Sequence, residues 1–334
     1  MHKIIQKTKN FIKDYYKTLI IYIVIFCIFT INLPFYISAP GGLIDTKSRI
    51  KTEDSFKLKG SLNMTYVSEI HATLPTYIWS FIAKDWDLEK EEDTVIGNES
   101  VEDMYNRNKL LLKESNTIAE LVAYKYSNID YEISNEKLYV TYIDENAKTN
   151  LKNNDQIIEI DGNKIPDKNY IFSYVASKNI GDKITLKVIR NKKKIEREAT
   201  LIDIEGEPKV GIMITENFDI KSNKKVDFTF DSSESGPSGG LMSTLTIYSY
   251  LNKIDLTDGR KIAGTGTIDI NGNVGQISGV KYKLIGAVNN KADVFIVPKG
   301  DNYNEAKKVK KERGFKIDIV PVETFEQALN YLSK

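Results

Sequence analysis

Cysteine and histidine are almost missing from this chain of 334 residues, which has one cysteine, Cys27, and two histidines, His2 and His71. A single cysteine excludes a disulfide within the chain. So few histidines exclude most His-based metal sites and leave little scope for a Ser-His-Asp triad. We therefore expect no metal and no other cofactor, and any hydrolase chemistry would need a base other than histidine.

An excess of charge of either sign is also missing, since 47 Lys and Arg face 46 Asp and Glu and leave a net charge of +1. No global charge therefore attracts nucleic acid or an acidic substrate. The sequence contains no G-x-x-x-x-G-K-(S/T) loop, the motif that holds nucleotide phosphates. We expect neither nucleic acid nor ATP among the partners, and the composition, 41% hydrophobic and 28% charged, is that of a globular protein.

Charged residues are absent between positions 19 and 39, which read LIIYIVIFCIFTINLPFYISA. About 20 apolar residues are enough to cross a hydrocarbon core of roughly 30 Å as a helix. The run predicts a transmembrane helix over 19–39, behind a basic tail at 1–18. Cys27 lies inside this span and is expected to be inert.

The same pattern also begins a cleaved signal peptide, which is the alternative to an uncleaved signal anchor. A cut after Ala39 would leave Pro40 just beyond the bond and the bulky Ile37 two residues before it, so the sequence favours the anchor. The tail carries five lysines, and the first fifteen residues after the span carry three Lys or Arg. This difference favours a cytoplasmic N-terminus. We expect a single-pass protein of the cell membrane with residues 40–334 on its outer side.

Residues 40–124 are predicted to form a juxtamembrane region of strands and a helix. Apolar residues recur with helical spacing over 98–124, with polar residues on the opposite face. This spacing predicts one long amphipathic helix. Asn98 or Ser100 would cap its N-terminus.

Strand patterns dominate from about 125 to 205, where a small separate domain is predicted. Two segments in it, LKNNDQIIEIDGNKI at 151–165 and GDKITLKVIR at 181–190, resemble the two strand motifs of the PDZ domain of bacterial proteases. The resemblance implies a PDZ-like β-barrel whose edge groove accepts an extended chain by strand addition. A β-domain that serves only as a scaffold is the alternative. The predicted strands are 138–143, 156–160, 183–189 and 195–201.

The segment around Ser238 combines a strand, a glycine-rich turn and a helix. Residues 226–230 alternate in polarity, and GPSGG then opens an apolar run with helical spacing. Pro237 suits the first position of a helix, and Gly236 and Gly239 let a substrate backbone approach closely. Free backbone N–H groups at such a turn can bind a developing oxyanion. By itself, the motif fits a plain helix cap without chemistry better than a catalytic turn.

Four further motifs follow this turn in order: a TGT strand, a glycine hairpin, a GVKYK helix start and a late IVP strand. Together the five resemble the proteolytic domain of the Lon family. The resemblance implies a Lon-type proteolytic α/β domain over 206–334, with Ser238 as the nucleophile, Lys283 as the catalytic lysine and Thr265 beside it. The sequence departs from the Lon pattern at Ser235, where aspartate is usual, and at Gly239, where alanine is usual.

The residue types are compatible with that chemistry. A serine hydroxyl is a weak nucleophile until a base takes its proton. A lysine can do so when it is neutral, and burial in an apolar pocket lowers the pKa of an amine. Lys281 and Lys283 lie two apart on the predicted helix, so only one can face the serine. Periodicity leaves the choice open, and the register of the family selects Lys283, with Thr265 orienting its amine.

A transmembrane helix, a PDZ-like domain and a Lon-type domain in this order resemble the membrane-anchored, PDZ-containing Lon-like serine proteases of Gram-positive bacteria. The resemblance implies an α+β multidomain protein and an ATP-independent endopeptidase that cleaves secreted or membrane proteins and peptides. It also implies a homo-oligomer, a hexamer in many Lon-type proteins. The alternative is a catalytically idle scaffold whose PDZ-like groove binds a partner at the membrane, because a dyad in the sequence does not guarantee aligned geometry.

Overall fold

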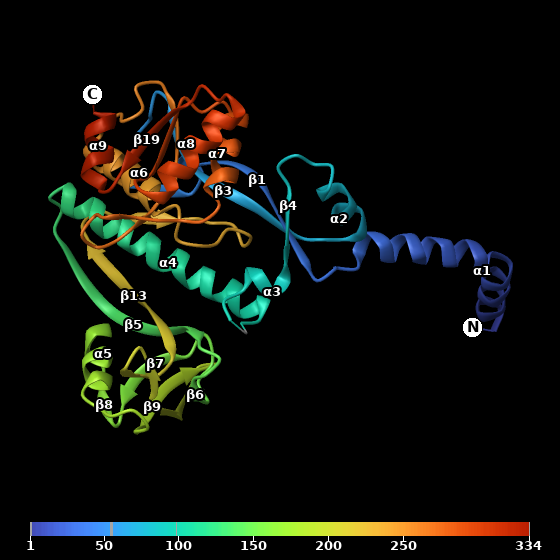
Figure 1. Cartoon of the computed structure of the whole chain (residues 1–334), viewed down its shortest axis with the longest axis horizontal. Coiled ribbons are helices and arrows are strands. Elements are labelled where there is room, and N and C mark those ends of the chain that lie inside the picture. Colours follow the sequence, from blue (N-terminus) through green and yellow to red (C-terminus); the bar gives the residue numbers. More distant parts are fainter. Residues whose placement is uncertain (1, 54–55, 98, 334) are drawn as a thin grey trace. The chain divides into compact units, whose positions relative to one another are not determined.

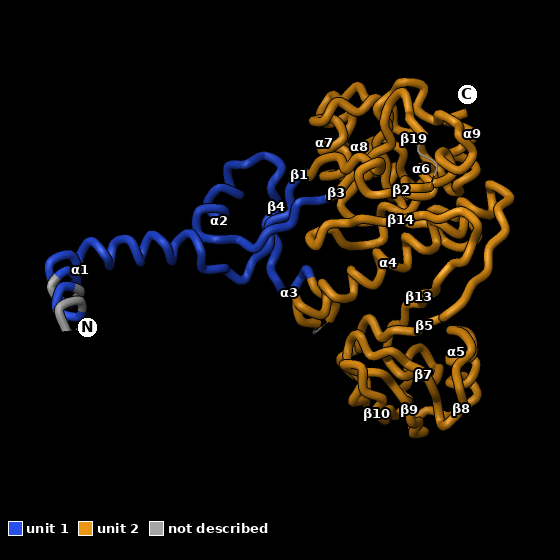
Figure 2. The backbone as a smooth tube through the Cα atoms, turned by 180° about the vertical axis from the view of Figure 1, so that it is seen from behind, with its two compact units in different colours: residues 1–40, 67–94 blue, residues 41–66, 95–334 orange. Residues whose placement is uncertain are grey.

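The computed structural model describes residues 2–53, 56–97 and 99–333, and Figure 1 shows the order of the elements along the chain. The backbone separates into two compact units (Figure 2). Unit 1 comprises residues 1–40 and 67–94, and unit 2 comprises residues 41–66 and 95–334.

Unit 1 contains the predicted membrane segment. In this unit the first residues of strand β1 pair antiparallel with β4, with Phe35 opposite Lys90 and Ser38 opposite Asp87. Helix α2 begins at a capping box formed by Thr73 and Thr76. The elements that lie wholly in this unit are α1 (His2–Thr30), α2 (Leu74–Ser80), β4 (Asp87–Lys90) and α3 (Glu91–Thr94).

The predicted transmembrane helix over 19–39 differs from the structure. Helix α1 ends at Thr30, and β1 (Phe35–Asp45) begins directly after Pro34. Proline disfavours a helical conformation in the residue before it and has no N–H for a helical hydrogen bond, so the apolar run is divided between a helix and a strand. Within the described residues, no helix is both long enough and apolar enough to cross a membrane.

The main sheet of unit 2 is largely parallel, with the strand order β19-β18-β15-β3-β1. Its strands alternate between two hydrophobic cores, as successive side chains in a strand must. Ile262 and Ile296 belong to a core shared with α4, α6 and α9, whereas Ala263 and Phe295 belong to a core shared with α7 and α8. Helices therefore cover both faces of the sheet, which is typical of parallel sheets. The bounds are β3 (Ser61–His71), β15 (Lys261–Gly264), β18 (Val294–Pro298), β19 (Asp318–Val322), α6 (Gly240–Asn252), α7 (Val280–Asn289), α8 (Asp301–Arg313) and α9 (Phe325–Leu332).

The long predicted helix is confirmed as α4 (Val101–Tyr126). Ser100 caps it, because its side chain accepts a hydrogen bond from the backbone N–H of Asp103. Asn98, the other predicted cap, lies outside the described residues. The buried side chains of α4, among them Ala119 and Val122, pack in the core that contains α6.

A second sheet, which is antiparallel, is formed by the residues between α4 and the Ser238 segment. Its strand order is β13-β5-β7-β9-β10-β6, and β8 pairs with β7. It has a hydrophobic core of its own, which includes Val140, Ile160, Ile184 and Val188. The four predicted strands correspond to β5, β7, β9 and β10. The bounds are β5 (Tyr131–Ile143), β6 (Lys148–Thr149), β7 (Gln156–Ile160), β8 (Asn163–Lys164), α5 (Lys168–Ala176), β9 (Lys183–Arg190), β10 (Lys193–Thr200) and β13 (Ile212–Ser222).

Unit 2 also contains short antiparallel ladders, which pair β2 with β14, β11 with β12 and β16 with β17. The ladder of β2 with β14 matters most for the site, since β14 leads into the turn that carries Ser238. The bounds are η1 (Thr46–Ser48), β2 (Ile50–Thr52), β11 (Ile202–Ile204), β12 (Glu207–Lys209), β14 (Val226–Phe228), β16 (Thr267–Ile268) and β17 (Val274–Gly275).

Candidate active site

Ser238 lies in the turn between strand β14 and helix α6. The chain reverses at Gly236, whose φ of 87° is in the left-handed region that glycine adopts without strain. The sequence predicted Pro237 as the first helical residue, but the structure does not place it in the helix. Helix α6 begins at Gly240, whose N–H donates to the Pro237 carbonyl at 3.2 Å. The helix therefore begins three residues later than predicted, and Ser238 lies in the turn ahead of it.

The backbone of Ser238 is fixed by the segment that follows strand β15. Its carbonyl accepts a hydrogen bond from the N–H of Gly266 at 2.8 Å and another from Oγ1 of Thr265 at 3.1 Å. Two donors on one carbonyl leave the residue little freedom to rotate. The direction of the Ser238 side chain is thus set by a different part of the chain.

Lys283 reaches the same point from helix α7. Its Nζ lies 2.9 Å from Oγ of Ser238 and 3.2 Å from Oγ1 of Thr265. The residue is only 5% exposed, and Val280, Leu284 and Ala287 of the same helix pack in the core beside it. The structure therefore brings together the serine, the lysine and the threonine that the sequence singled out.

Lys281 points elsewhere, which decides between the two lysines of the motif. Its Nζ lies over the ring of Tyr282, 5.1 Å from the ring centre. Residues two apart on a helix point in nearly opposite directions. Only Lys283 is therefore in reach of Ser238.

The hydrogen bonds of Thr265 constrain the amine. A hydroxyl has one proton to donate, and that of Thr265 is used on the Ser238 carbonyl. Toward Lys283 the threonine oxygen is consequently an acceptor, and the amine donates an N–H to it. A neutral amine that donates in this direction can aim its lone pair at Oγ of Ser238.

The two glycines predicted for the oxyanion turn differ in their availability. The N–H of Gly236 donates to the carbonyl of Asn108 at 2.9 Å. It is therefore occupied, and Gly236 serves the turn alone. The N–H groups of Ser238 and Gly239 have no acceptor in the part of the chain that the structure describes, so these two are available to a developing oxyanion.

Helix α4 supplies contacts to the turn that sequence reasoning missed. Besides the carbonyl of Asn108, Oγ of Ser115 donates to the Pro237 carbonyl at 3.0 Å. Neither residue belongs to a motif, and both lie more than a hundred positions before Ser238 in the chain. Only the three-dimensional structure places them there.

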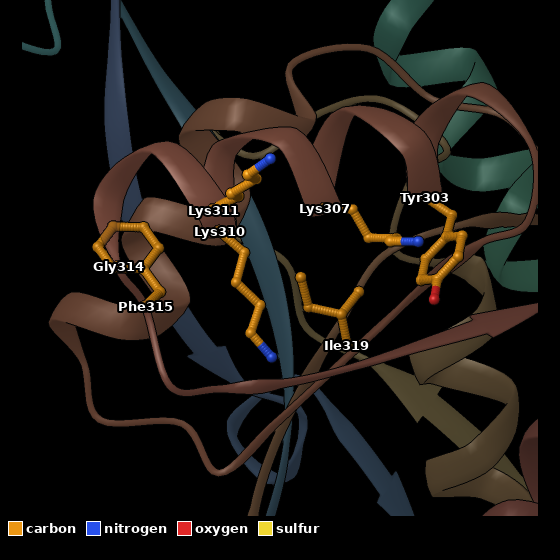
Figure 3. Close-up of a pocket in the computed structure, with 7 residues that line it drawn as sticks. All are labelled: Tyr303, Lys307, Lys310, Lys311, Gly314, Phe315 and Ile319. Carbon is orange, nitrogen blue, oxygen red and sulfur yellow. The ribbon is translucent and has the colours of Figure 1, made fainter.

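A hollow of about 480 Å³ lies on the surface of α8 and the segment after it (Figure 3). Neither Ser238, Lys283 nor Thr265 lines it. Lys307 and Lys311 are exposed, while Ala306 and Val309 of the same helix are buried. These lysines of α8 therefore lie on the solvated face of an amphipathic helix. The lining residues are Tyr303, Lys307, Lys310, Lys311, Gly314, Phe315 and Ile319.

Comparison with known families divides the chain into two recognisable parts. Residues 231–333 match the Lon protease (S16) C-terminal proteolytic domain. Residues 117–201 match the PDZ domain. The two matches fit a PDZ-containing Lon-like protease, and the first supports a serine peptidase.

Curated relatives match about a third of the chain. Lon protease 2 of Borreliella burgdorferi is 30% identical over 122 residues, which are 35% of this chain and 15% of that protein. Lon protease of Rickettsia bellii is 31% identical over 96 residues, which are 29% of this chain and 12% of that protein. The chain thus spans less than a sixth of the length of these relatives.

Solved structures match about a quarter of the chain. The PDZ domain of an SdrC-like protein from Listeria innocua is 30% identical, with a TM-score of 0.22, and the match covers 23% of this chain and 92% of that one. The corresponding domain from Listeria monocytogenes is 25% identical, with a TM-score of 0.23, and covers 25% and 92%.

Proposed function

We propose that this chain is a serine endopeptidase in which Ser238 is the nucleophile and Lys283 the general base. The observation that carries the proposal is the 2.9 Å separation of Lys283 Nζ and Ser238 Oγ. The burial of the lysine supports it, because removing an ammonium group from water costs free energy and favours the neutral amine. Thr265 holds that amine at 3.2 Å.

The reaction proceeds in two steps that this geometry allows. Lys283 takes the hydroxyl proton of Ser238 while Oγ attacks the peptide carbonyl carbon. The carbonyl oxygen becomes an oxyanion, which the N–H groups of Ser238 and Gly239 stabilise. The protonated lysine then gives its proton to the leaving amine, and the acyl group stays on Oγ. Water, deprotonated by the same lysine, releases the acyl group and restores the enzyme.

The dyad is tested by peptide hydrolysis with purified full-length chain. We expect Ser238→Ala and Lys283→Met each to lower kcat about 10³-fold or more, as loss of a nucleophile or its base does in related hydrolases. Lys281→Met is the matched control, since it removes a lysine of the same helix that does not reach Ser238. Equal activity of Lys283→Met and Lys281→Met would contradict the assignment. A folded wild type without any hydrolysis would favour the idle scaffold.

We propose that the substrates are flexible or extended segments of proteins and peptides, cut without ATP. The chain carries no phosphate-binding loop with which to drive unfolding. The PDZ domain would recruit an extended chain by strand addition. Unchanged peptide hydrolysis on addition of ATP and magnesium is the expected result, and a requirement for ATP would contradict this part of the proposal.

The predicted hexamer is tested by the mass measured in light scattering.

We also propose that α1 holds the chain at the cell membrane, with residues 40–334 on the outer side. Large apolar side chains are exposed along its C-terminal half, such as Tyr22 (65%), Phe26 (67%) and Phe29 (62%). In the same unit Phe81 and Ile82, directly after α2, are 70% and 71% exposed. Such side chains favour a lipid boundary over water. Added trypsin should digest the chain in intact protoplasts, and protection until lysis would contradict the outward location.

A further inference from the structure

The loop of residues 231–236, which leads to Ser238, is closed on itself by Glu234. The backbone N–H of Glu234 donates to the Asp231 carbonyl at 3.0 Å. In return, Oε2 of Glu234 accepts from the backbone N–H of Asp231 at 2.8 Å. The loop is thus a turn whose shape depends on one carboxylate.

Arg49 holds the same carboxylate from a distant part of the sequence. Its Nε lies 3.0 and 2.9 Å from the two carboxylate oxygens of Glu234, and its Nη2 lies 2.8 Å from Oε1. Nη2 also contacts Oδ2 of Asp231 at 2.5 Å. The side chains of Arg49 and Glu234 are only 19% and 15% exposed, and forked, partly buried contacts of this kind are the strong and geometrically specific ones.

The position of Arg49 is itself fixed by backbone pairing. Strands β2 and β14 form a ladder, and beyond it the Arg49 carbonyl accepts from the N–H of Thr229 at 2.8 Å. The guanidinium is therefore carried by the residue directly before β2, the strand that pairs with β14 ahead of the loop.

Helix α4 holds the loop from another direction. Nζ of Lys109 donates to the Glu234 carbonyl at 2.6 Å, and the Tyr105 hydroxyl donates to the Ser232 carbonyl. The Asn108 carbonyl accepts from Gly236, as described above. Positions 105, 108 and 109 are neighbours on one face of a helix, so one rigid surface contacts the whole loop.

We propose that Glu234, clamped by Arg49 and Lys109, is a positioning residue for the nucleophile. Only three residues separate it from Ser238, and one of them, Gly236, is itself bonded to the Asn108 carbonyl of α4. Loss of the clamp lets the turn move, and Oγ of Ser238 then spends less time within reach of Lys283. The inference rests on the proposed peptidase function and adds to it the residues that keep the dyad aligned.

The kinetic test compares Glu234→Gln and Arg49→Met in the full-length chain. We expect each to lower the rate of acylation by a small fluorophosphonate and the kcat for a short peptide by about 10- to 100-fold, the effect of a misplaced reacting group, with KM changed less than about twofold. Arg49→Lys, which keeps the charge but not the fork, should lie between. The double variant should be no slower than the slower single variant, because both remove the same clamp.

Asp155→Asn is the matched control. Asp155 forms a forked pair with Arg190, with both contacts at 2.6 Å and an arginine side chain equally exposed at 19%. It lies directly before strand β7 of the PDZ domain, so its loss should leave acylation by the small reagent unchanged. Equal rates for Glu234→Gln and Asp155→Asn would overturn the proposal.

Amide hydrogen exchange tests the clamp without reference to activity. We expect exchange of the Gly236 and Gly240 amides, which donate to the Asn108 and Pro237 carbonyls, to be at least about tenfold faster in Glu234→Gln than in wild type, and unchanged in Asp155→Asn. Unchanged exchange in Glu234→Gln would overturn the clamp by itself. If wild type is inactive but exchange is still faster in Glu234→Gln, the result would contradict the peptidase function and leave the clamp in place.

Discussion

Among single residues, Thr265 has the most constrained role in the site. Its hydroxyl donates to the Ser238 carbonyl, and its oxygen lies 3.2 Å from Lys283 Nζ. One side chain therefore fixes both the backbone of the nucleophile and the direction of the base. The residue is fully buried, so no water molecule replaces it without a rearrangement of the core.

Two substitutions distinguish the contribution of the Thr265 hydroxyl from that of the side-chain volume. Thr265→Val keeps the volume and removes the hydrogen bonds, and we expect kcat for a short peptide to fall about 10- to 100-fold. Thr265→Ser keeps the hydroxyl and should retain most of the activity. Steady-state kinetics of both variants is the measurement. An active Thr265→Val beside an impaired Thr265→Ser would show that packing of the methyl group, and not the hydroxyl, is what the site needs.

Glu120 makes stability depend on pH. Burial raises the pKa of its carboxyl from 4.5 to about 7, and the charge of Asp227 acts in the same direction, against the hydrogen bond from Tyr124. The Tyr124 hydroxyl lies 2.8 Å from Oε1 of Glu120 and also contacts the Lys224 carbonyl. It has one proton for two acceptors, which also favours a protonated Glu120.

The sign of this effect follows from linkage. Between pH 4.5 and about 7 the unfolded chain has released the proton of Glu120 and the folded chain has kept it, so stability falls as pH rises through this window. We expect Glu120→Gln to remove this loss and to be more stable than wild type at pH 8, by at most about 3 kcal/mol.

Urea unfolding at pH 4 and pH 8 measures the effect. Glu323→Gln is the control, because Glu323 is a surface carboxyl whose pKa is lowered by the hydrogen bond from Lys299, so its loss cannot raise stability. An equal stability difference between Glu120→Gln and wild type at both pH values would contradict the account.

At the scale of elements, the start of helix α6 is the most tightly packed part of the site. A Cβ at Gly240 would lie 2.7 Å from Oγ of Ser115 and 3.0 Å from Ile268. A Cβ at Gly239 would lie 2.8 Å from Sδ of Met64, which is the flexible end of a side chain. Both glycines lack a positive φ, so space alone distinguishes them.

Alanine at these two positions should therefore have different effects. Gly240→Ala pushes Ser115 away from the Pro237 carbonyl, and we expect it to lower both stability, by about 1–3 kcal/mol, and kcat. Gly239→Ala, which restores the residue usual in the Lon pattern, should be close to wild type in both. Thermal unfolding and peptide kinetics of the pair decide the matter, and equal effects would contradict the packing argument.

The sequence predicted those elements whose signal is local. Helix α4 follows from an apolar spacing of 3.6 residues, and strand β7 from a short apolar run between turns. The glycine-rich turn singled out Ser238, but the roles of Ser238 and Lys283 came from the resemblance to the Lon proteolytic domain. The register of a family was still needed to choose Lys283 over Lys281, since both positions fit the helix.

What the sequence could not predict depends on contacts between distant positions. Arg49 and Glu234 are 185 residues apart, and nothing near either indicates the other. The hydrogen bond of the Gly236 N–H likewise depends on a distant residue, because its acceptor is the carbonyl of Asn108 in α4. The helix predicted over 19–39 ends at Thr30 in the structure, because apolar composition alone does not register how Pro34 divides the run.

At the scale of the whole molecule, unit 2 contains two hydrophobic cores that the long strand pair of β5 and β13 links. One core contains α6, and the other, the PDZ core, contains β7 and β9. One end of β5 and β13, at Tyr131 and Ile220, packs against the core that contains α6. The other end, at Val140 and Ile214, packs in the PDZ core. The two cores share no side chain, so we expect them to respond separately to substitution.

Ile184→Ala tests this separation. Ile184 is 1% exposed in the PDZ core, and its truncation should cost about 2–5 kcal/mol. We expect amide exchange to become faster in β7 and β9, while α6 and the hydrolysis of a short peptide stay as in wild type. A parallel loss of protection in α6 would show that the two cores unfold as one.

The central claim is that Ser238 is a nucleophile activated by Lys283. Intact mass and peptide mapping after reaction with a fluorophosphonate test it most directly. The account predicts one adduct, on Ser238, in wild type and Lys281→Met, and at most slow labelling in Lys283→Met. Labelling of folded Lys283→Met at the wild-type rate, or no adduct on Ser238 in folded wild type, would contradict it.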